Sequence, residues 1–240
     1  MNEQGKLPGL VSWTGYLALT LLLVLPLSVL TVRSGAWQQG LLLYAIACFG
    51  SALLILLSLL LLLLPRFAHW RKQVALRMLP ALPGTVLVFS LLLGADVPRI
   101  HDITTDTEDP PTFAKAEQLR GAASNSLEIE RAVIEQQRDA YPDIQTLLTE
   151  EAFDDAFDRA TRVANELGWE IYREDRNAGI IEAVDTSAIM AFKDDIVIRI
   201  RTNAQGTLLD LRSVSRVGES DLGANAARIR TFAAAFQQQG

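Results

Sequence analysis

The chain has 240 residues, of which 50% are hydrophobic, and it carries a formal net charge of −6 at pH 7. The charge is divided unevenly, because residues 1–96 contain six Lys/Arg and two Asp/Glu, whereas residues 97–240 contain sixteen and twenty-six. This length leaves room for one soluble domain and a second unit. A strongly acidic C-terminal part repels nucleic acid and anionic lipid headgroups, so we expect neither as its partner.

The N-terminal part predicts three membrane-spanning helices, at about residues 12–32, 41–64 and 78–96. The first two runs have no charged residue and reach the ~20 residues that cross the hydrocarbon core of a bilayer. The third run is shorter, and its Pro80 and Pro83 suit the first turn of a helix. A cleaved signal peptide in place of the first helix is disfavoured, because the apolar run is longer than a usual signal-peptide core. We therefore expect the lipid bilayer to be one partner of the chain.

Basic residues predict the orientation of these helices. The loop expected between the second and third helices holds four of them: Arg66, Arg71, Lys72 and Arg77. The hairpin between the first two helices holds only Arg33. Because loops rich in Lys and Arg lie on the cytoplasmic side, we expect a cytoplasmic N-terminus and a C-terminal part outside after three crossings. In a bacterium this means the inner membrane and the periplasm. If the third run fails to cross, the C-terminal part stays in the cytoplasm.

The C-terminal part predicts an extended linker followed by an α+β domain. Residues 97–148 have little apolar periodicity, and the prolines of HDITTDTEDPPTF indicate an extended chain. From residue 149 to 240 the pattern changes to an amphipathic helix, four strands and a last helix from about 220 to 237. Because the connections are short, we expect a two-layer domain in which both helices cover one face of a four-stranded antiparallel sheet.

The turn NAQG between the last two strands predicts their register. If Thr202 faces Thr207, then Arg199 faces Asp210 on the neighbouring strand. One face of the sheet is then apolar, and the other carries acidic and basic side chains close enough for salt bridges. Exposed pairs of this kind contribute only ~0–1 kcal/mol each, so a solvated charge ladder without a function is one interpretation.

The last strand leads into the last helix through RVGESD, where a ligand site is a second interpretation. Ser220 or Asp221 can cap the N-terminus of that helix. The free amides there, with Arg212 and Arg216 nearby, can hold an anion. Glu219 brings negative charge to the same place, which favours a structural corner in which the arginines hold carboxylates. The candidate ligand-binding residues are Asp195, Arg199, Arg212, Ser213, Ser215, Arg216, Asp221, Asn225 and Arg228.

Two stretches of this region, FKDDIVIRI and DLRSVSRVGESDLGANAARIR, carry a family resemblance. Together with HDITTDTEDPPTF, YPDI and LGWEI upstream, they resemble the membrane-anchored bacterial branch of domain-of-unknown-function family 1499, from about residue 100 to 236. The segment AASNS stands where other branches have a Cys-Val-Ser-Ser-like element. The family has no established activity, so the resemblance implies no reaction. The family pattern falls on Phe192, Asp194, Asp195, Arg199, Asp210, Arg212, Ser213, Ser215, Arg216, Gly218, Asp221, Gly223, Asn225 and Arg228.

The sequence leaves any catalytic residues unassigned, and it predicts no metal site and no cofactor. Ser213 and Ser215 would need His101, the only histidine after residue 97, to fold back over the sheet before a serine–histidine–acid arrangement formed. The only cysteine, Cys48, lies in the second apolar run, and the chain has too few histidines for a structural zinc site. A phosphate-binding loop and a dinucleotide fingerprint are both missing from the sequence.

We therefore expect a membrane-anchored envelope protein whose C-terminal domain is a non-enzymatic binding or accessory module that uses the Arg/Asp-rich corner. Its expected partner is an envelope protein or a small anionic ligand. Two alternatives remain open. One is a hydrolase-like or transferase-like enzyme acting on an anionic substrate at the same corner. The other is a scaffold subunit that works through its transmembrane helices.

Overall fold

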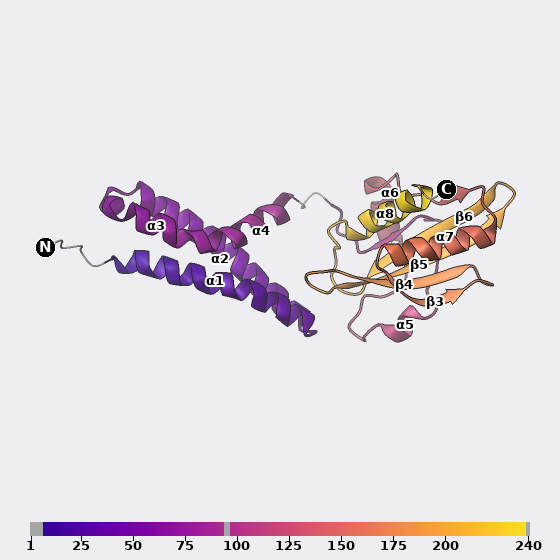
Figure 1. Cartoon of the computed structure of the whole chain (residues 1–240), viewed down its shortest axis with the longest axis horizontal. Helices are drawn as coiled ribbons and strands as arrows, with labels where there is room; N and C mark the ends of the chain where they lie inside the picture. The colour runs from indigo at the N-terminus through magenta and orange to yellow at the C-terminus, as the bar shows by residue number, and fades with distance from the viewer. Residues whose placement is uncertain (1–6, 94–96, 239–240) are drawn as a thin grey trace. The chain divides into compact units, whose positions relative to one another are not determined.

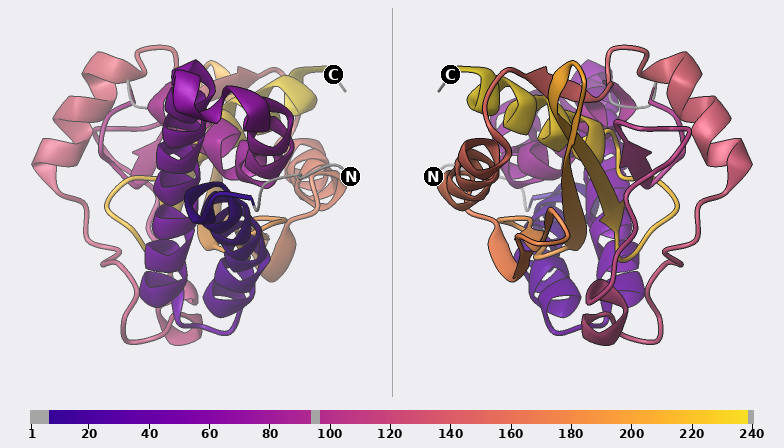
Figure 2. Two further views of the ribbon diagram at one scale, coloured as in Figure 1. Left: turned by 90° about the vertical axis from the view of Figure 1, so that its left-hand side faces the viewer. Right: turned by 90° about the vertical axis from the view of Figure 1, so that its right-hand side faces the viewer.

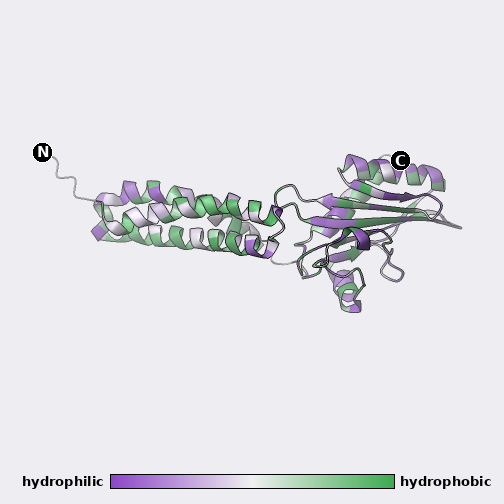
Figure 3. Cartoon of the chain, turned by 90° about the horizontal axis from the view of Figure 1, so that it is seen from below, coloured by the Kyte–Doolittle hydropathy of each residue, from purple (hydrophilic) through white to green (hydrophobic). Residues whose placement is uncertain are grey.

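The computed structural model describes residues 7–93 and 97–238, and the chain divides into two compact units, residues 1–95 and 96–240 (Figure 1). The first unit contains three helical stretches that are long and apolar enough to cross a bilayer, and their hydrophobic residues appear in green in Figure 3. The prediction of three apolar helices followed by a separate α+β domain is confirmed.

The third helical stretch begins earlier than the sequence predicted. It runs through four consecutive short elements and is apolar enough to span from Pro65 to Ser90, rather than starting at residue 78. The basic residues expected in a loop therefore lie in its first helical turns. Pro80 and Pro83 fall in the first turns of η2 and α4, where a missing backbone N–H costs no hydrogen bond. The elements of this unit are α1 (Gly9–Arg33), α2 (Trp37–Leu63), η1 (Pro65–Trp70), α3 (Arg71–Met78), η2 (Leu79–Ala81) and α4 (Leu82–Leu93).

Small residues hold the three apolar helical stretches close together. A Cβ atom added to Gly40 of α2 would overlap Val32 of α1. One added to Gly84 of α4 would lie 2.5 Å from the Ser51 Oγ of α2. In lipid there is little hydrophobic force between helices, so such close backbone contact supplies the packing energy.

The three stretches run up, down and up. Val11 near the start of α1 packs with Leu61 near the end of α2 and with Phe67 and Val74 of the third stretch. The Arg77 side chain lies against Gly15 of α1. The end of the bundle at which α1 begins is therefore also the end that carries the basic residues.

The second unit is built on a six-stranded antiparallel sheet with strand order β1-β6-β5-β4-β3, in which β2 also pairs with β6. Strands β3 to β6 are the four that the sequence predicted, and β1 and β2 come from the segment expected to be a linker. The strands are β1 (Asp102–Thr104), β2 (Leu147–Thr149), β3 (Glu170–Asp175), β4 (Ile180–Thr186), β5 (Lys193–Asn203) and β6 (Gly206–Ser215). The helices are α5 (Ala116–Leu119), α6 (Arg131–Ala140), α7 (Phe153–Glu166) and α8 (Ala224–Gln238).

The register predicted for the last hairpin is confirmed. Thr202 pairs with Thr207 and Arg199 with Asp210 across β5 and β6. Because side chains alternate along a strand, each strand places one set of residues on each face of the sheet.

Helices α7 and α8 cover one face of the sheet, as Figures 1 and 2 show. Phe157 and Val163 of α7 and Phe232 of α8 are completely buried there, and Trp169 stacks on Phe232 with ring centroids 5.4 Å apart. This is the main hydrophobic core of the domain. Its sheet residues are Ile181, Ala183, Ile196, Ile198, Ile200, Leu209 and Leu211.

The opposite face is not solvated, because residues 105–128, which we call the strap, lie across it. The Thr105 N–H donates to the Leu211 carbonyl at 2.8 Å, and the Asn125 N–H donates to the Arg216 carbonyl at 2.7 Å. Gln137 of α6 is 1% exposed and bonds both backbone groups of Thr104. The extended linker expected over residues 97–148 is thus part of the domain. Hydrogen bonds and ion pairs hold this segment in place. Contacts of this kind need no apolar residues, so the sequence of the segment shows no apolar periodicity.

Candidate functional site

The nine candidate residues do not form one corner. Arg212 and Ser213 are neighbours on β6, so their side chains point to opposite faces of the sheet. The structure therefore separates the candidates into two networks, one under the strap and one beside α8. The first contains Asp195, Arg199, Arg212 and Arg216. The second contains Ser213, Ser215, Asp221, Asn225 and Arg228.

Arg212 is the most deeply buried arginine under the strap, at 1% exposed. Its Nε and Nη2 donate to the two carboxylate oxygens of Asp102 in β1, at 3.0 and 2.7 Å. Nη2 also donates to the Leu127 carbonyl at 2.7 Å, and the guanidinium lies 5.4 Å from the centre of the Phe113 ring. Arg212 thus fastens β1, the middle of the strap and its C-terminal end to the sheet.

Arg199 and Arg201 meet the acids of the strap on the same face. Arg199 Nη2 lies 3.0 Å from Asp210 Oδ2, the cross-strand pair that the register predicted, and 3.1 Å from Asp106 Oδ2. Arg201 Nη2 lies 2.8 Å from the same oxygen of Asp106. Burial raises the pKa of the Asp106 carboxyl, but hydrogen bonds from the amides of residues 109 and 108 and the two arginines outweigh it and lower the pKa overall.

Asp195 is fully buried and is shared by two arginines. Arg216 donates to it through Nε at 2.9 Å and Nη2 at 2.8 Å, and Arg120 Nε of the strap lies 3.4 Å away. The Tyr172 hydroxyl donates to it at 3.4 Å. Burial, followed by the nearby Asp195 carboxylate, raises the pKa of Tyr172.

Glu182 of β4 is also fully buried on this face, and sequence reasoning missed its role. Its carboxylate accepts hydrogen bonds from the amides of Ala114, Lys115 and Ala116 at 3.0, 3.0 and 3.1 Å. Arg173 Nη1 donates to it at 2.7 Å. The one available signal was an acid inside the apolar run IIEAV.

Asn225 organises the second network, at the start of α8. It is fully buried; its Oδ1 accepts from Ser213 Oγ at 2.6 Å, and its Nδ2 donates to Ser215 Oγ and the His101 carbonyl, each at 3.0 Å. The bond to Ser215 ties the start of α8 to the SRVG turn that follows β6. Asp221 caps the helix, as expected, by accepting from the amides of Gly223 at 2.8 Å and Asn225 at 2.7 Å.

Arg228 joins this network to two acids. Its Nε donates to Asp185 Oδ2 at 2.9 Å and its Nη2 to Asp194 Oδ2 at 2.6 Å. Its Nη1 donates to Ser213 Oγ at 3.0 Å. Burial, followed by the negative charge of Asp194, raises the pKa of the Asp221 carboxyl, although its two amide partners oppose the shift.

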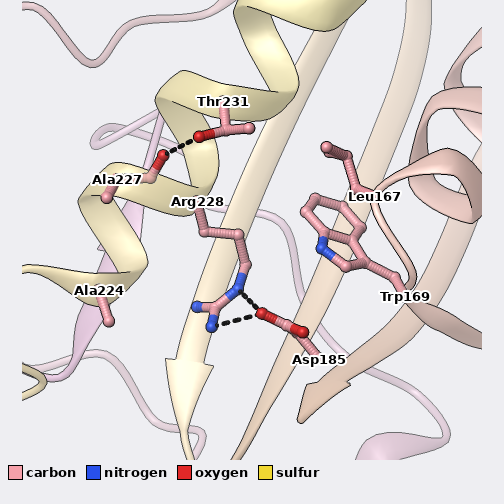
Figure 4. Close-up of a pocket in the computed structure, with 7 residues that line it drawn as sticks. All are labelled: Leu167, Trp169, Asp185, Ala224, Ala227, Arg228 and Thr231. Atoms are coloured by element: carbon pink, nitrogen blue, oxygen red, sulfur yellow. Dashed lines mark hydrogen bonds and ion pairs between the residues drawn. The ribbon is translucent and has the colours of Figure 1, made fainter. Parts of the chain in front are cut away.

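A pocket of about 280 Å³ opens beside this network, and Figure 4 shows its lining. Asp185 is the lining acid that faces Arg228, and its side chain is 30% exposed. Trp169 and Leu167 form an apolar wall opposite the small side chains of α8 (Figure 4). The lining residues are Leu167, Trp169, Asp185, Ala224, Ala227, Arg228 and Thr231.

The two candidate hydroxyls are already engaged. Ser213 donates to Asn225, and Ser215 accepts from it. Within residues 7–93 and 97–238, no histidine side chain is hydrogen-bonded to either hydroxyl. The same described ranges contain no group of three or more His, Cys, Asp or Glu that could hold a metal ion.

The family described as "Protein of unknown function (DUF1499)" matches residues 102–236, which is more than half of the chain. The chain belongs to this family. The match begins at the first residue of β1, so the family unit includes the strap as well as the four predicted strands. Comparison with curated proteins finds no match.

Proposed function

We propose that this protein is a non-enzymatic binding module of the bacterial envelope, held in the inner membrane by its three apolar helices. The observation that carries the proposal is the way the domain uses its charged groups. The arginines and acids that suggested an active site are buried against one another, and Ser213 and Ser215 bond to Asn225. This arrangement supports a folded scaffold more than an enzyme acting on an anionic substrate, because a reacting group needs access to its substrate.

We assign ligand binding to the pocket of Figure 4, which Arg228 lines together with residues outside the candidate set. Arg228 is placed between Asp185 and Asp194, so the two acids that it contacts exceed its single positive charge by one. Asp185 is the more exposed of the two acids. A group that combines a positive charge with apolar carbon fits such a lining, and we propose a basic side chain of an envelope protein as the occupant.

Trp169 provides the test, because the other three tryptophans of the chain lie in the membrane unit. In a full-length variant in which Trp13, Trp37 and Trp70 are replaced by Phe, N-acetyl-arginine amide should change the Trp169 emission saturably, and N-acetyl-glutamate amide should not. Asp185→Asn should weaken the arginine response by about tenfold, the effect of losing one hydrogen bond to a charged group.

The control for this test is Asp139→Asn, which removes an exposed acid from α6 and should leave the response unchanged. Equal responses to the two amides, or an unchanged response after Asp185→Asn, would exclude the pocket as a site for basic side chains.

The placement of the domain is a separate part of the proposal. Basic residues gather at the end of the bundle where α1 begins, which supports a cytoplasmic N-terminus and a periplasmic C-terminal domain. Periplasm-active and cytoplasm-active reporters fused after Gly240 of the full chain test this. Activity of the periplasmic reporter alone is expected; activity of the cytoplasmic reporter alone would mean that residues 65–90 do not cross.

A further inference from the structure

We propose that Arg120 and the loop that follows α5 form a second binding site, which takes a small oxyanion such as phosphate or a carboxylate. The site lies on the strap face of the sheet and is separate from the pocket of Figure 4 in its lining residues. Nothing in the sequence pattern indicated Arg120, since it falls in the segment expected to be a linker.

The first observation is the state of the Arg120 guanidinium. Its side chain is only 4% exposed. Nη2 donates to the Ser215 carbonyl at 3.0 Å, but Nε and Nη1 have no hydrogen-bond partner among the described residues. A buried guanidinium that lacks acceptors is costly, and native proteins supply such groups with an acceptor.

The second observation is the local charge. Asp195 already accepts both Nε and Nη2 of Arg216, in the geometry that satisfies a carboxylate with one arginine. Arg120 reaches Asp195 only at 3.4 Å through Nε. Two guanidinium groups therefore share one carboxylate, so positive charge exceeds negative charge by one among Arg120, Arg216 and Asp195.

Burial and the neighbouring charges both affect the pKa of the Arg120 guanidinium. Burial is the main cause that lowers its pKa, Asp195 opposes the shift, and the like charge of Arg216 adds to it. An anion bound next to Arg120 would relieve both the burial cost and the repulsion from Arg216.

The third observation is the space beside the guanidinium. A depression of about 320 Å³ is lined by Arg120 and by residues of the following loop, among them Ser124 and Ser126. Their hydroxyls can donate to an anion. Asn125 fixes the base of the loop, because its Nδ2 donates to the carbonyls of Ser215 at 3.0 Å and Gly218 at 2.8 Å. The walls are therefore held in place before a ligand arrives.

One acid, Glu117, also lines the depression, and it is exposed. Its carboxylate opposes an anion, so its removal should strengthen binding, whereas removal of Arg120 should weaken it. Substitution of the two residues should therefore change the anion affinity of the same site in opposite directions.

The experiment is isothermal titration of the full-length protein, in a neutral detergent, with inorganic phosphate, glycerol 3-phosphate, acetate and citrate. We expect saturable binding of at least one probe. Arg120→Gln should weaken it by at least about tenfold, since a charged hydrogen-bond partner is lost. Arg120→Lys should have an intermediate effect because it keeps the charge without the planar donor group. Glu117→Gln should strengthen binding by about twofold to threefold.

Arg131→Gln is the matched control, since it removes an exposed positive charge from the start of α6, and it should change the affinity by less than about twofold. Preference for glycerol 3-phosphate over inorganic phosphate would indicate a lipid headgroup as the source of the oxyanion; equal binding would indicate a free anion. Thermal melting of each variant shows whether it is folded. If Arg120→Gln does not fold, the comparison of Glu117→Gln with the wild type decides.

Two results would overturn the proposal. One is that none of the four probes binds the wild-type protein, which would mean that water satisfies Arg120. The other is that a folded Arg120→Gln variant, or Glu117→Gln in its place, binds the probe as the wild type does.

Discussion

The two faces of the β5–β6 hairpin are buried to a similar degree, but by different chemistry. On one face Ile196, Ile198 and Leu211 lie under α7 and α8 and are 0% exposed. On the other face Asp195 and Arg212 are 0% and 1% exposed under the strap. Apolar packing covers the first face, and ion pairs and backbone hydrogen bonds cover the second.

The difference shows what each face contributes. Burying an Ile or Leu side chain stabilises a fold by ~1.5–3 kcal/mol. A buried ion pair gains little over an apolar pair of the same shape, because desolvation offsets the attraction, yet breaking one partner is strongly destabilising. The helix-covered face therefore provides most of the stability. The ion pairs of the other face fix the position of the strap, a polar segment that has no apolar pattern of its own.

The largest expected effect comes from Arg212→Ala. It leaves the Asp102 carboxylate buried without its bidentate partner, and it should lower the free energy of unfolding by ~3–5 kcal/mol. Denaturant unfolding of the full chain, with Trp13, Trp37 and Trp70 replaced by Phe so that emission reports Trp169, measures it. Arg138→Ala removes an arginine whose side chain is 47% exposed and whose partner is Glu108, and it should cost only ~0–1 kcal/mol. Equal effects of the two variants would mean that the Arg212 pair is not structural.

Glu182→Gln should have a smaller and more local effect. It removes the charge that holds the amides of Ala114, Lys115 and Ala116, so it should cost ~1.5–3 kcal/mol and loosen that part of the strap. Amide exchange at these three positions should accelerate more than exchange in β5. Glu174→Gln, at an exposed position of β3, serves as the control. Unchanged exchange at residues 114–116 would contradict the role given to Glu182.

The smallest effect concerns acid pH. The folded state holds the Asp106 pKa below its ordinary value of 3.8, so its contribution to stability is fully present above that value. The contribution is lost as the pH falls through the lower, folded-state pKa. Asp106→Asn should therefore lose stability at neutral pH and show a shallower decline in acid. Unfolding free energies measured from pH 7 to 2 test this, and parallel curves for the two proteins would refute it.

The sequence predicted the parts of the domain that follow local rules. Period-two alternation and the NAQG turn predicted the β5–β6 register, and one of the two residues proposed as the cap of α8, Asp221, caps it. The strap was missed because its contacts are not local: Thr105 and Leu211, which are hydrogen-bonded, are 106 residues apart. The usable signal was complementarity, since the charged face of the hairpin needed partners and the acids of HDITTDTEDPPTF could supply them.

The sequence predicted which residues of the candidate site form polar contacts, but not how they are grouped in space. All nine residues take part, through their side chains, in the hydrogen bonds or ion pairs described above, yet the sheet separates them into two groups. Arg120 and Glu182 could not be selected from the sequence. The first lacked any regular pattern around it, and the second carried only one signal, an acid inside the apolar run IIEAV, which does not name its partners.

Hydrogen exchange of the strap amides in the full-length protein tests the central claim most directly, namely that residues 105–128 are an integral layer of the domain. The amides of Thr105, Asn125 and Ala116, bonded to Leu211, Arg216 and Glu182, should exchange nearly as slowly as those of β5. Exchange of these three amides at the rate of an unstructured chain, with β5 still protected, would show that the segment is a linker and that the charged face is open.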